Sequence, residues 1–323
     1  MGKSIAASSL PTEGLVALYS PKSPGGYTAG TIVDLSGNGN DLALTGNYYI
    51  TSSALYSGSV FFASGSHAIT GTDLSASLHG TGSQYTIISF TAIYGDGGIN
   101  YIDPIWWIGG PTSSADQKQI YNGGVSETSP GWGIGVSNKN YSSYPQTQPW
   151  LLFDNPDSYR PGATSWIATR EKFGVGNNPW SFQAVSKGDQ TPTYTGADTN
   201  LTIYSRGYGV ANPGPIGEWK YLNLLNSDVY GYAYTEPQYS PVITGSKEDA
   251  GFIYNLNLTT TGNKFSTNLD NSILLLSPVG GGVTNPSYAG AYRTFYFGGM
   301  VIYDRVLSAD EVSSICSFYF NQY

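Results

Sequence analysis

Short apolar segments separated by turns rich in glycine, proline and asparagine are the feature that most constrains this chain. The clearest segment is residues 85–94, a run of β-branched and aromatic residues followed by Gly95-Asp96-Gly97-Gly98, which is typical of a β-strand. Helical periodicity is almost absent until the end of the chain. Many strands between tight turns predict two antiparallel sheets packed face to face. The other predicted strands are residues 15–19, 31–35, 42–44, 60–62, 105–108, 132–136, 150–153, 165–169, 181–185, 201–204, 251–258, 273–276 and 295–303.

The composition fits this prediction and limits the partners of the protein. Among 323 residues there are 42 Gly and 27 Tyr, which suit tight turns and half-buried strands respectively. Charged residues make up 11% of the chain, and 14 basic against 22 acidic residues give a net charge of −8. Because phosphates and anionic lipids are neutralised by clustered Lys and Arg, we expect neither a nucleic-acid nor a membrane partner.

The N-terminal residues 1–13 are small and polar, and they predict an arm that precedes the folded domain. They lack the apolar core of a secretory signal, and no apolar stretch of about 18 residues follows that would span a bilayer. We therefore expect the protein to be made in a cytoplasm. Residues 14–323 contain no clear linker and predict one domain, with insertions near 109–131 and 206–250.

The end of the chain carries a helix signature. Ser308 and Glu311 are spaced as a capping box, in which each side chain accepts a hydrogen bond from the backbone N–H of the other residue. The apolar residues that follow fall on one helical face: Val312, Ile315, Cys316 and Tyr319. A helix of about three turns is predicted to pack on the sandwich through this face. Cys316 is the only cysteine, so no intrachain disulfide can form, and its position favours a buried apolar side chain over a reactive thiol.

Two motifs at opposite ends of the chain carry a family resemblance. Residues 14–19 read Gly-Leu-Val-Ala-Leu-Tyr and residues 34–41 read Asp-Leu-Ser-Gly-Asn-Gly-Asn-Asp, while residues 301–312 read Val-Ile-Tyr-Asp-Arg-Val-Leu-Ser-Ala-Asp-Glu-Val. In this order they resemble the opening and the ending of laminin G-like domains of the concanavalin A-like lectin/glucanase superfamily. The resemblance implies an all-β, two-sheet antiparallel jelly-roll sandwich with long loop insertions and a short C-terminal helix.

Because that superfamily includes glucanases, glycoside hydrolysis is the first enzymatic hypothesis. It needs two carboxyl groups across the scissile bond, which the glucanases place at alternate positions of one strand. Glu218 and Glu236 instead flank an aromatic segment, Glu248 and Asp249 lie in a polar turn, and Glu311 caps the predicted helix. No catalytic residue is assigned, and a non-enzymatic protein is predicted.

The segment 34–41 is also the candidate metal site. Members of the superfamily often hold calcium near the rim of the sandwich, and Asp34, Asn38, Asn40 and Asp41 supply the oxygen ligands that calcium prefers. The same residue types hydrogen-bond their own backbone in tight turns, and we favour that role. No cofactor is required by the predicted function; calcium is the one candidate ion.

Aromatic side chains are the candidate contact residues. A surface that binds glycans or proteins commonly uses Trp and Tyr, although the same residues also fill β-sandwich cores. The residues predicted to contact a glycan or a partner are Trp106, Trp107, Trp132, Tyr230, Tyr232 and Tyr234. For each single residue the core role is favoured, but the tyrosine density within 206–250 indicates a contacting surface.

Three functions remain open. The favoured one is a non-enzymatic structural protein of a virus particle, with a bacteriophage as the expected source: a capsid decoration, head-fibre or tail-fibre component. Its partners would be other virion proteins, copies of itself and host surface carbohydrate. The alternative is a secreted or surface lectin with an extracellular location, and a divergent glycoside hydrolase is the third.

Overall fold

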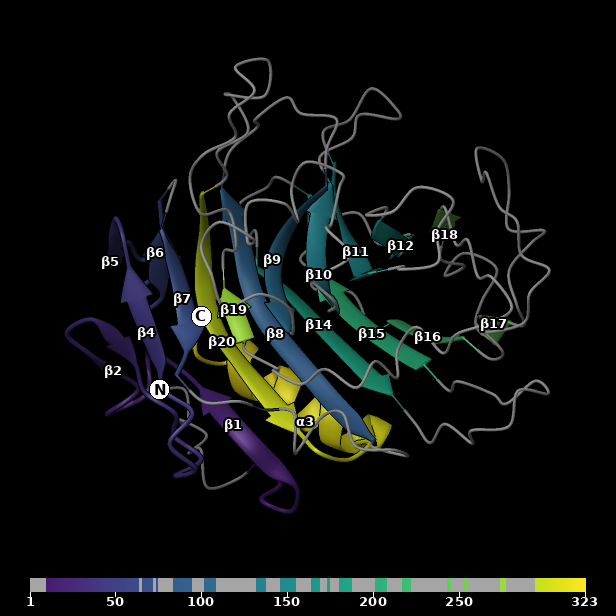
Figure 1. Cartoon of the computed structure of the whole chain (residues 1–323), viewed down its shortest axis with the longest axis horizontal. Helices are drawn as coiled ribbons and strands as arrows, with labels where there is room; N and C mark the ends of the chain where they lie inside the picture. Colours follow the sequence, from purple (N-terminus) through teal and green to yellow (C-terminus); the bar gives the residue numbers. More distant parts are fainter. Residues whose placement is uncertain are drawn as a thin grey trace.

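Two antiparallel β-sheets and one C-terminal helix form the described part of the chain (Figure 1). The computed structural model describes residues 10–63, 66–71, 74, 84–94, 102–108, 132–137, 146–154, 164–168, 173–174, 180–187, 201–207, 217–221, 243–244, 252–254, 274–276 and 294–323, some strand residues by their backbone alone. The chain repeatedly crosses between the sheets, so that strands distant in sequence become neighbours.

The nine-stranded sheet, here called sheet A, runs in the order β17-β16-β15-β14-β8-β20-β6-β5, with β1 also paired to β20. Its strands are β1 (Leu15–Tyr19), β5 (Tyr48–Ile50), β6 (Val60–Phe62), β8 (Tyr85–Tyr94), β14 (Trp180–Lys187), β15 (Leu201–Gly207), β16 (Gly217–Tyr221), β17 (Ile243–Thr244) and β20 (Thr294–Tyr303). The first and last strands therefore pair, which brings the two family-like motifs into contact: Tyr303 pairs with Leu15, and Met300 with Tyr19.

The eleven-stranded sheet, sheet B, runs in the order β18-β12-β11-β10-β9-β19-β7-β4-β3-β2, with β13 paired to β11. Its strands are β2 (Tyr27–Thr28), β3 (Thr31–Ile32), β4 (Leu42–Thr45), β7 (His67–Thr70), β9 (Ile102–Ile108), β10 (Trp132–Ser137), β11 (Gln146–Asp154), β12 (Thr164–Ala168), β13 (Phe173–Gly174), β18 (Phe252–Tyr254) and β19 (Leu274–Leu276). This two-sheet architecture with its C-terminal helix confirms the predicted fold class.

The long central strand β8 of sheet A is buried on both of its faces. In β8, Ile88 and Phe90 point to one face while Ile87 and Ser89 point to the other, because side chains alternate along a strand, and all four are buried. One face packs on the C-terminal helix, so the other is turned toward sheet B. Strands that are buried on both sides read as continuous apolar runs, as residues 85–94 do.

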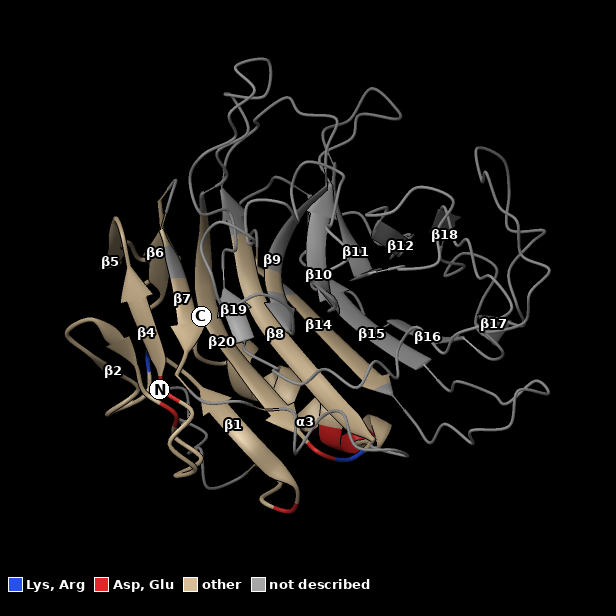
Figure 2. Ribbon diagram, in the orientation of Figure 1, with Lys and Arg blue, Asp and Glu red and all other residues tan. Residues whose placement is uncertain are grey.

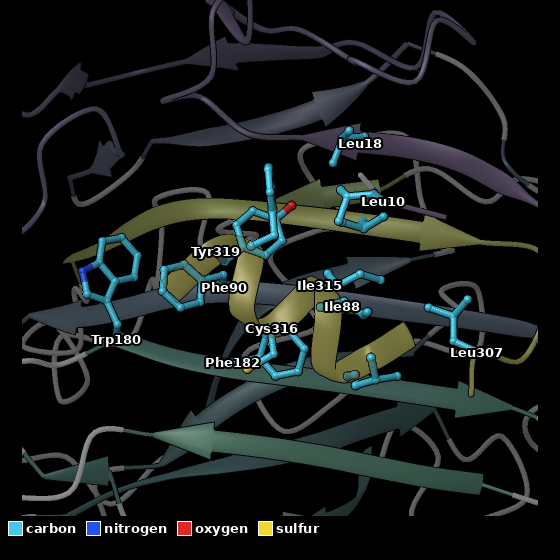
Figure 3. Packing of buried hydrophobic residues seen from close by; sticks show 14 of the residues in the cluster. Leu10, Leu18, Ile88, Phe90, Trp180, Phe182, Leu307, Ile315, Cys316 and Tyr319 are labelled. Carbon is cyan, nitrogen blue, oxygen red and sulfur yellow. The ribbon is translucent and has the colours of Figure 1, made fainter. Parts of the chain in front are cut away.

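The helix α3 (Ala309–Phe320) covers the outer face of sheet A. Its predicted capping box is present: the N–H of Ser308 donates to Glu311 Oε2 at 2.9 Å, and the N–H of Glu311 donates to Ser308 Oγ at 3.3 Å. The predicted apolar face is also confirmed, since Val312, Ile315, Cys316 and Tyr319 are all fully buried. Figure 3 shows this face of α3 directed at the strands, with Cys316 beside Phe182 and Ile315 beside Ile88.

Arg305, between β20 and α3, binds both the N-terminal segment and the first turn of the helix. Its guanidinium forms a two-pronged ion pair with the Glu311 carboxylate, at 2.6 and 3.1 Å, and its Nε donates to the carbonyl of Glu13 at 2.9 Å. The hydrogen bonds from Arg305, followed by those from Ser308, lower the pKa of Glu311 to about 2. The same arginine therefore binds the Glu311 carboxylate, which caps the helix, and the carbonyl of Glu13 in the N-terminal segment.

Several differences from the sequence predictions are informative. Residues 10–13, predicted as part of an arm, pack on the domain, with Leu10 only 5% exposed; residues 1–9 lie outside the described part. Within the predicted insertion 206–250, short strands β16 and β17 extend sheet A, whereas 109–131 lies outside the described residues. No helix in the described part of the chain has the length and apolar character needed to cross a bilayer.

Candidate contact surface

The predicted calcium residues lie together, in the turn that follows β3. The carboxylate of Asp34 is 6% exposed and accepts three backbone hydrogen bonds: its Oδ1 from the N–H of Leu18 and of Ser36, both at 2.9 Å, and its Oδ2 from the N–H of Asn40 at 3.0 Å. Asp41 Oδ1 in turn accepts from the N–H of Asp34 at 2.8 Å. Both glycines of this turn, at 37 and 39, have positive φ, as the sequence pattern predicts.

The two asparagines of the turn bind strand β1. Asn38 Nδ2 donates to the carbonyls of Leu15 and Val16, at 2.8 and 3.0 Å, and Asn40 Nδ2 donates to Val16 at 2.8 Å. Tyr19 Oη donates to the carbonyl of Asn40 at 2.6 Å. Burial, and then the nearby acidic residues of the turn, raise the pKa of Tyr19 well above its usual value, so this donor keeps its proton.

In this turn the polar side chains form hydrogen bonds with backbone N–H and C=O groups. Both carboxylate oxygens of Asp34 already accept hydrogen bonds, and a calcium ion would have to displace backbone N–H donors, two of which, those of Leu18 and Asn40, make buried hydrogen bonds. In the described part of the chain, His, Cys, Asp and Glu do not gather in groups of three or more that could hold a metal ion. The geometry favours the structural role of the turn, and the calcium site stays a prediction.

The predicted contact aromatics are placed differently from one another. Trp106 in β9 is fully buried, so its ring belongs to the core and cannot be a surface platform; the core role, which sequence reasoning favoured for each single aromatic, applies here. Trp107 in β9 and Trp132 in β10 are described by their backbone alone. Tyr230, Tyr232 and Tyr234 lie outside the described residues.

A different set of aromatic residues forms a continuous row on the outer face of sheet A. Tyr49 of β5 is paired in register with Phe61 of β6, and Phe61 with Tyr296 of β20. Tyr296 is paired with Ala92 of β8, which is itself paired with Trp180 of β14. Residues directly opposite one another project on the same face. We call Tyr49, Phe61, Tyr296 and Trp180, with the intervening Tyr56, the aromatic row.

Tyr56 enters the row from the loop between β5 and β6, and it belongs to the same buried cluster as Ala92. Its ring stacks on Tyr296 at a centroid distance of 3.8 Å and meets Trp180 at 5.8 Å. Trp180 Nε1 donates to the carbonyl of Leu55 in the same loop at 2.9 Å. Tyr56 thus connects the Tyr296 ring of β20 to the Trp180 ring of β14, across β8, which contributes only Ala92 at this position.

The Trp180 end of the row is closed. Trp180 stacks on Phe90 at 4.6 Å, and Tyr323, after α3, lies 4.3 Å from the Trp180 ring. The ammonium group of Lys22 lies 4.5 Å above the centre of the Tyr323 ring and donates to the carbonyl of Gln322. Burial raises the pKa of Tyr323 and lowers that of Lys22. This end of the row is part of the core.

The Tyr49 end of the row is open. Tyr49 is 52% exposed and Leu55 is 45% exposed, the two highest values among large apolar side chains in the described part, and Phe61 is half-buried between the open and closed ends. We call these three residues the β5 patch. Residues 42–72 contain no Asp, Glu, Lys or Arg, and Figure 2 shows β4, β5 and β6 without charged residues. The sequence signal that would have found this surface is a long uncharged segment with aromatic pairs at 48–49 and 61–62.

Together, the fold and this surface define the described chain as an antiparallel β-sandwich, closed by a C-terminal helix and carrying an open aromatic edge. No protein-family model and no curated protein matches the chain. Solved structures do resemble it. The binding domain of Paraclostridial Mosquitocidal Protein 1 shows 13% identity and a TM-score of 0.48, over 96% of this chain and 53% of that one.

Two botulinum neurotoxin structures give similar values. A structure of botulinum neurotoxin type C, whose cell entry depends on interaction with two ganglioside molecules, shows 12% identity and a TM-score of 0.47, over 98% of this chain and 53% of that one. The serotype D ligand binding domain, in complex with N-acetylneuraminic acid, shows 9% identity and a TM-score of 0.46, over 98% and 52%. The chain spans about half of the length of each of these structures.

Proposed function

We propose that the protein is a non-enzymatic structural subunit of a virus particle, which works by making contacts with other proteins and with host surface carbohydrate. The observation that carries the contact role is the β5 patch, where an aromatic row that is closed at one end opens to solvent at a sheet edge. Aromatic side chains held rigidly by their neighbours are favourable contact groups, because little conformational entropy is lost when they bind.

The distribution of acidic residues supports a non-enzymatic role. On the described strands they are spread one to a strand, as Asp103 in β9, Asp154 in β11 and Glu218 in β16. A glycosidase of this fold would need two carboxyl groups on one face of a strand. Asp34 and Glu311, outside the strands, are occupied by the hydrogen bonds of the turn and of the helix cap.

The virion assignment is supported by composition. A chain with 11% charged residues and 27 tyrosines suits a subunit whose role is contact, and the resemblance to laminin G-like domains adds a fold that is common on surfaces. The test is to raise an antibody against the protein and to sediment particles from cells that produce it. The expected result is recovery in the particle fraction, in many copies per particle; recovery only in the soluble fraction would overturn the virion assignment.

A lectin is the second candidate, favoured by the exposed ring of Tyr49 in an uncharged segment rich in Ser and Thr. Exposed aromatic rings can stack on the C–H faces of sugars. The wild-type protein and the Tyr49→Ala variant would be compared on immobilised neutral and acidic glycans. Glycan binding that the variant loses, by a protein absent from particles, would favour the lectin over the virion subunit. Turnover of any glycan substrate would exclude the non-enzymatic role.

A further inference from the structure

β5 is an edge strand without the usual protection against pairing. In the described part of the chain it ends sheet A and pairs with β6 alone. Free N–H and C=O groups on an edge can pair with another strand, and proteins commonly prevent this with charged residues or proline. β5 reads Tyr-Tyr-Ile, and residues 42–72 around it contain neither proline nor a charged residue.

The existing ladder determines which backbone groups of β5 face outward. The N–H of Thr51 donates to the carbonyl of Ser59 at 3.0 Å, toward β6. Because the direction of the backbone groups alternates along an antiparallel strand, those of Tyr49 also face β6. The N–H and C=O groups of Tyr48 and Ile50 therefore point to the free edge. Two residues with outward backbone groups flank one residue with an exposed ring.

The charges of the chain favour this face for self-association. A second copy carries the same net charge of −8 and is repelled most where charges are concentrated. The acidic residues that Figure 2 draws in red lie near the start of β1, in the turn that follows β3 and around the start of α3, and three more lie on β9, β11 and β16. The strands β4, β5 and β6, which lie next to one another at this side of the described part, carry no charged residue, so charges on these strands do not oppose the approach of a second copy.

We propose that β5 pairs antiparallel with β5 of a second copy, across a two-fold axis at Tyr49. In this register Tyr48 of one copy lies opposite Ile50 of the other, and the outward groups of both residues form four inter-chain hydrogen bonds. Tyr49 lies opposite its own copy at a non-hydrogen-bonded position, where side chains are closest, with a Cα separation of about 4.5 Å. The aromatic row then continues from one sheet A into the next.

A pairing through three residues forms a weak dimer. Such a dimer is populated only where the local concentration of the protein is high. This inference deepens the proposed function by naming a second copy as a partner, and it rests on that function for the high local concentration. In dilute solution we expect dissociation in the range of about 100 μM, because interfaces of this size lie well below the area of stable complexes.

A disulfide test reports the register directly. The only native cysteine, Cys316, is fully buried, so a Tyr49→Cys thiol is the reactive one. At a Cα separation of about 4.5 Å the two thiols of a dimer can form a disulfide without backbone movement. Under mild oxidation of the full chain we expect a disulfide-linked dimer, formed at least about tenfold faster than by the matched Val306→Cys variant. Val306 is 39% exposed and lies between β20 and α3.

A charge test checks the same interface without oxidation. Tyr49→Asp and Val306→Asp each add one negative charge, but only the first would place two carboxylates opposite each other in the dimer. By sedimentation velocity up to about 1 mM, we expect dimerisation of the wild type to weaken about tenfold in Tyr49→Asp and to persist in Val306→Asp. Near-ultraviolet circular dichroism confirms the fold of each variant.

The outcomes separate the inference from the proposed function. A wild type that stays monomeric, or equal crosslinking of both cysteine variants, would overturn the β5 pairing. Saturable binding of a neutral glycan by a monomer, lost in Tyr49→Asp, would assign the patch to carbohydrate instead and also overturn it. Dimers from a protein absent from particles would overturn the virion assignment alone, and particles containing a protein that never pairs through β5 would overturn the pairing alone.

Discussion

Replacement of Asp34 by alanine tests whether the turn between β3 and β4 is held by hydrogen bonds. The variant removes the acceptor from three backbone N–H groups, those of Leu18, Ser36 and Asn40. The bonds to Leu18 and Asn40 are buried, whereas Ser36 is partly accessible to water. A buried donor left without an acceptor costs about 1–3 kcal/mol. Two such donors and one half-accessible donor give a loss of roughly 3–4 kcal/mol in the free energy of unfolding.

Urea denaturation measures this loss. For a chain of this size the free energy of unfolding falls by about 3 kcal/mol per molar urea, so the midpoint should drop by about 1 M. The Asp34→Asn variant keeps one acceptor oxygen but turns an amide N–H₂ toward a backbone donor, so a smaller loss of about 1–2 kcal/mol is expected. Both proteins would be measured in calcium and in EDTA.

The calcium comparison decides between the two roles of this carboxylate. If hydrogen bonding is the reason for Asp34, the wild-type midpoint is the same in calcium and in EDTA, and Asp34→Ala loses stability equally in both. The reasoning is refuted if Asp34→Ala costs less than about 1 kcal/mol in EDTA. It is also refuted if EDTA alone destabilises the wild type to the level of the variant, because calcium would then be the main partner of the carboxylate.

Three further substitutions test the packing and the helix cap by urea denaturation. Gly298→Ala would place a Cβ 2.6 Å from the Phe90 ring and 2.7 Å from the Trp180 ring, so we expect a loss of about 2–3 kcal/mol, against none for Gly71→Ala, where the Cβ meets no neighbour. Tyr319→Phe removes a buried hydrogen bond to the carbonyl of Tyr19 and should cost about 1 kcal/mol. Glu311→Gln should cost about 1 kcal/mol at pH 7. The pKa of Glu311 is lowered to about 2, so its contribution to the free energy of unfolding is complete above the ordinary glutamate range and is lost as pH falls toward 2. The difference in stability between wild type and Glu311→Gln should therefore shrink between pH 5 and 3. A constant difference over this range would contradict the argument.

The parts of the fold that sequence reasoning predicted are those with local causes. The capping box depends on residues three apart, and the turn at 36–41 depends on glycines that need positive φ; both are read from a few neighbouring letters. The strand 85–94 was equally clear because a doubly buried strand is apolar throughout. Strands such as β5, β7 and β16 were missed because they are short or polar, and only their pairing partners make them strands.

The candidate contact surface could not be predicted for a related reason. Trp106 and Tyr49 are both aromatic residues in strands, yet one is fully buried and the other 52% exposed. Their difference depends on whether another sheet or solvent lies over the ring, which is set by contacts between segments far apart in sequence. The in-register meeting of Tyr49, Phe61 and Tyr296 depends on pairing across more than 200 residues of sequence. The local sequence pattern shows that aromatic residues are present, but it does not predict that they meet as the aromatic row.

The two ends of the aromatic row have opposite roles that depend on each other. At the closed end, Trp180 packs against Phe90 and Tyr323. The register between β20 and β8 shifts between Phe297 and Gly299, and the absence of a Cβ at Gly298 lets the Phe90 and Trp180 rings approach. At the open end, Tyr49 rests on Phe61, with ring centroids 4.8 Å apart. Each ring packs on the next, so ring contacts run from Tyr323, just after α3, to Tyr49 at the sheet edge. A contact residue held in this way is ordered before it binds, and therefore loses less entropy on pairing. Loosening the closed end by Gly298→Ala should consequently weaken the association of β5 even though that residue lies far from the edge.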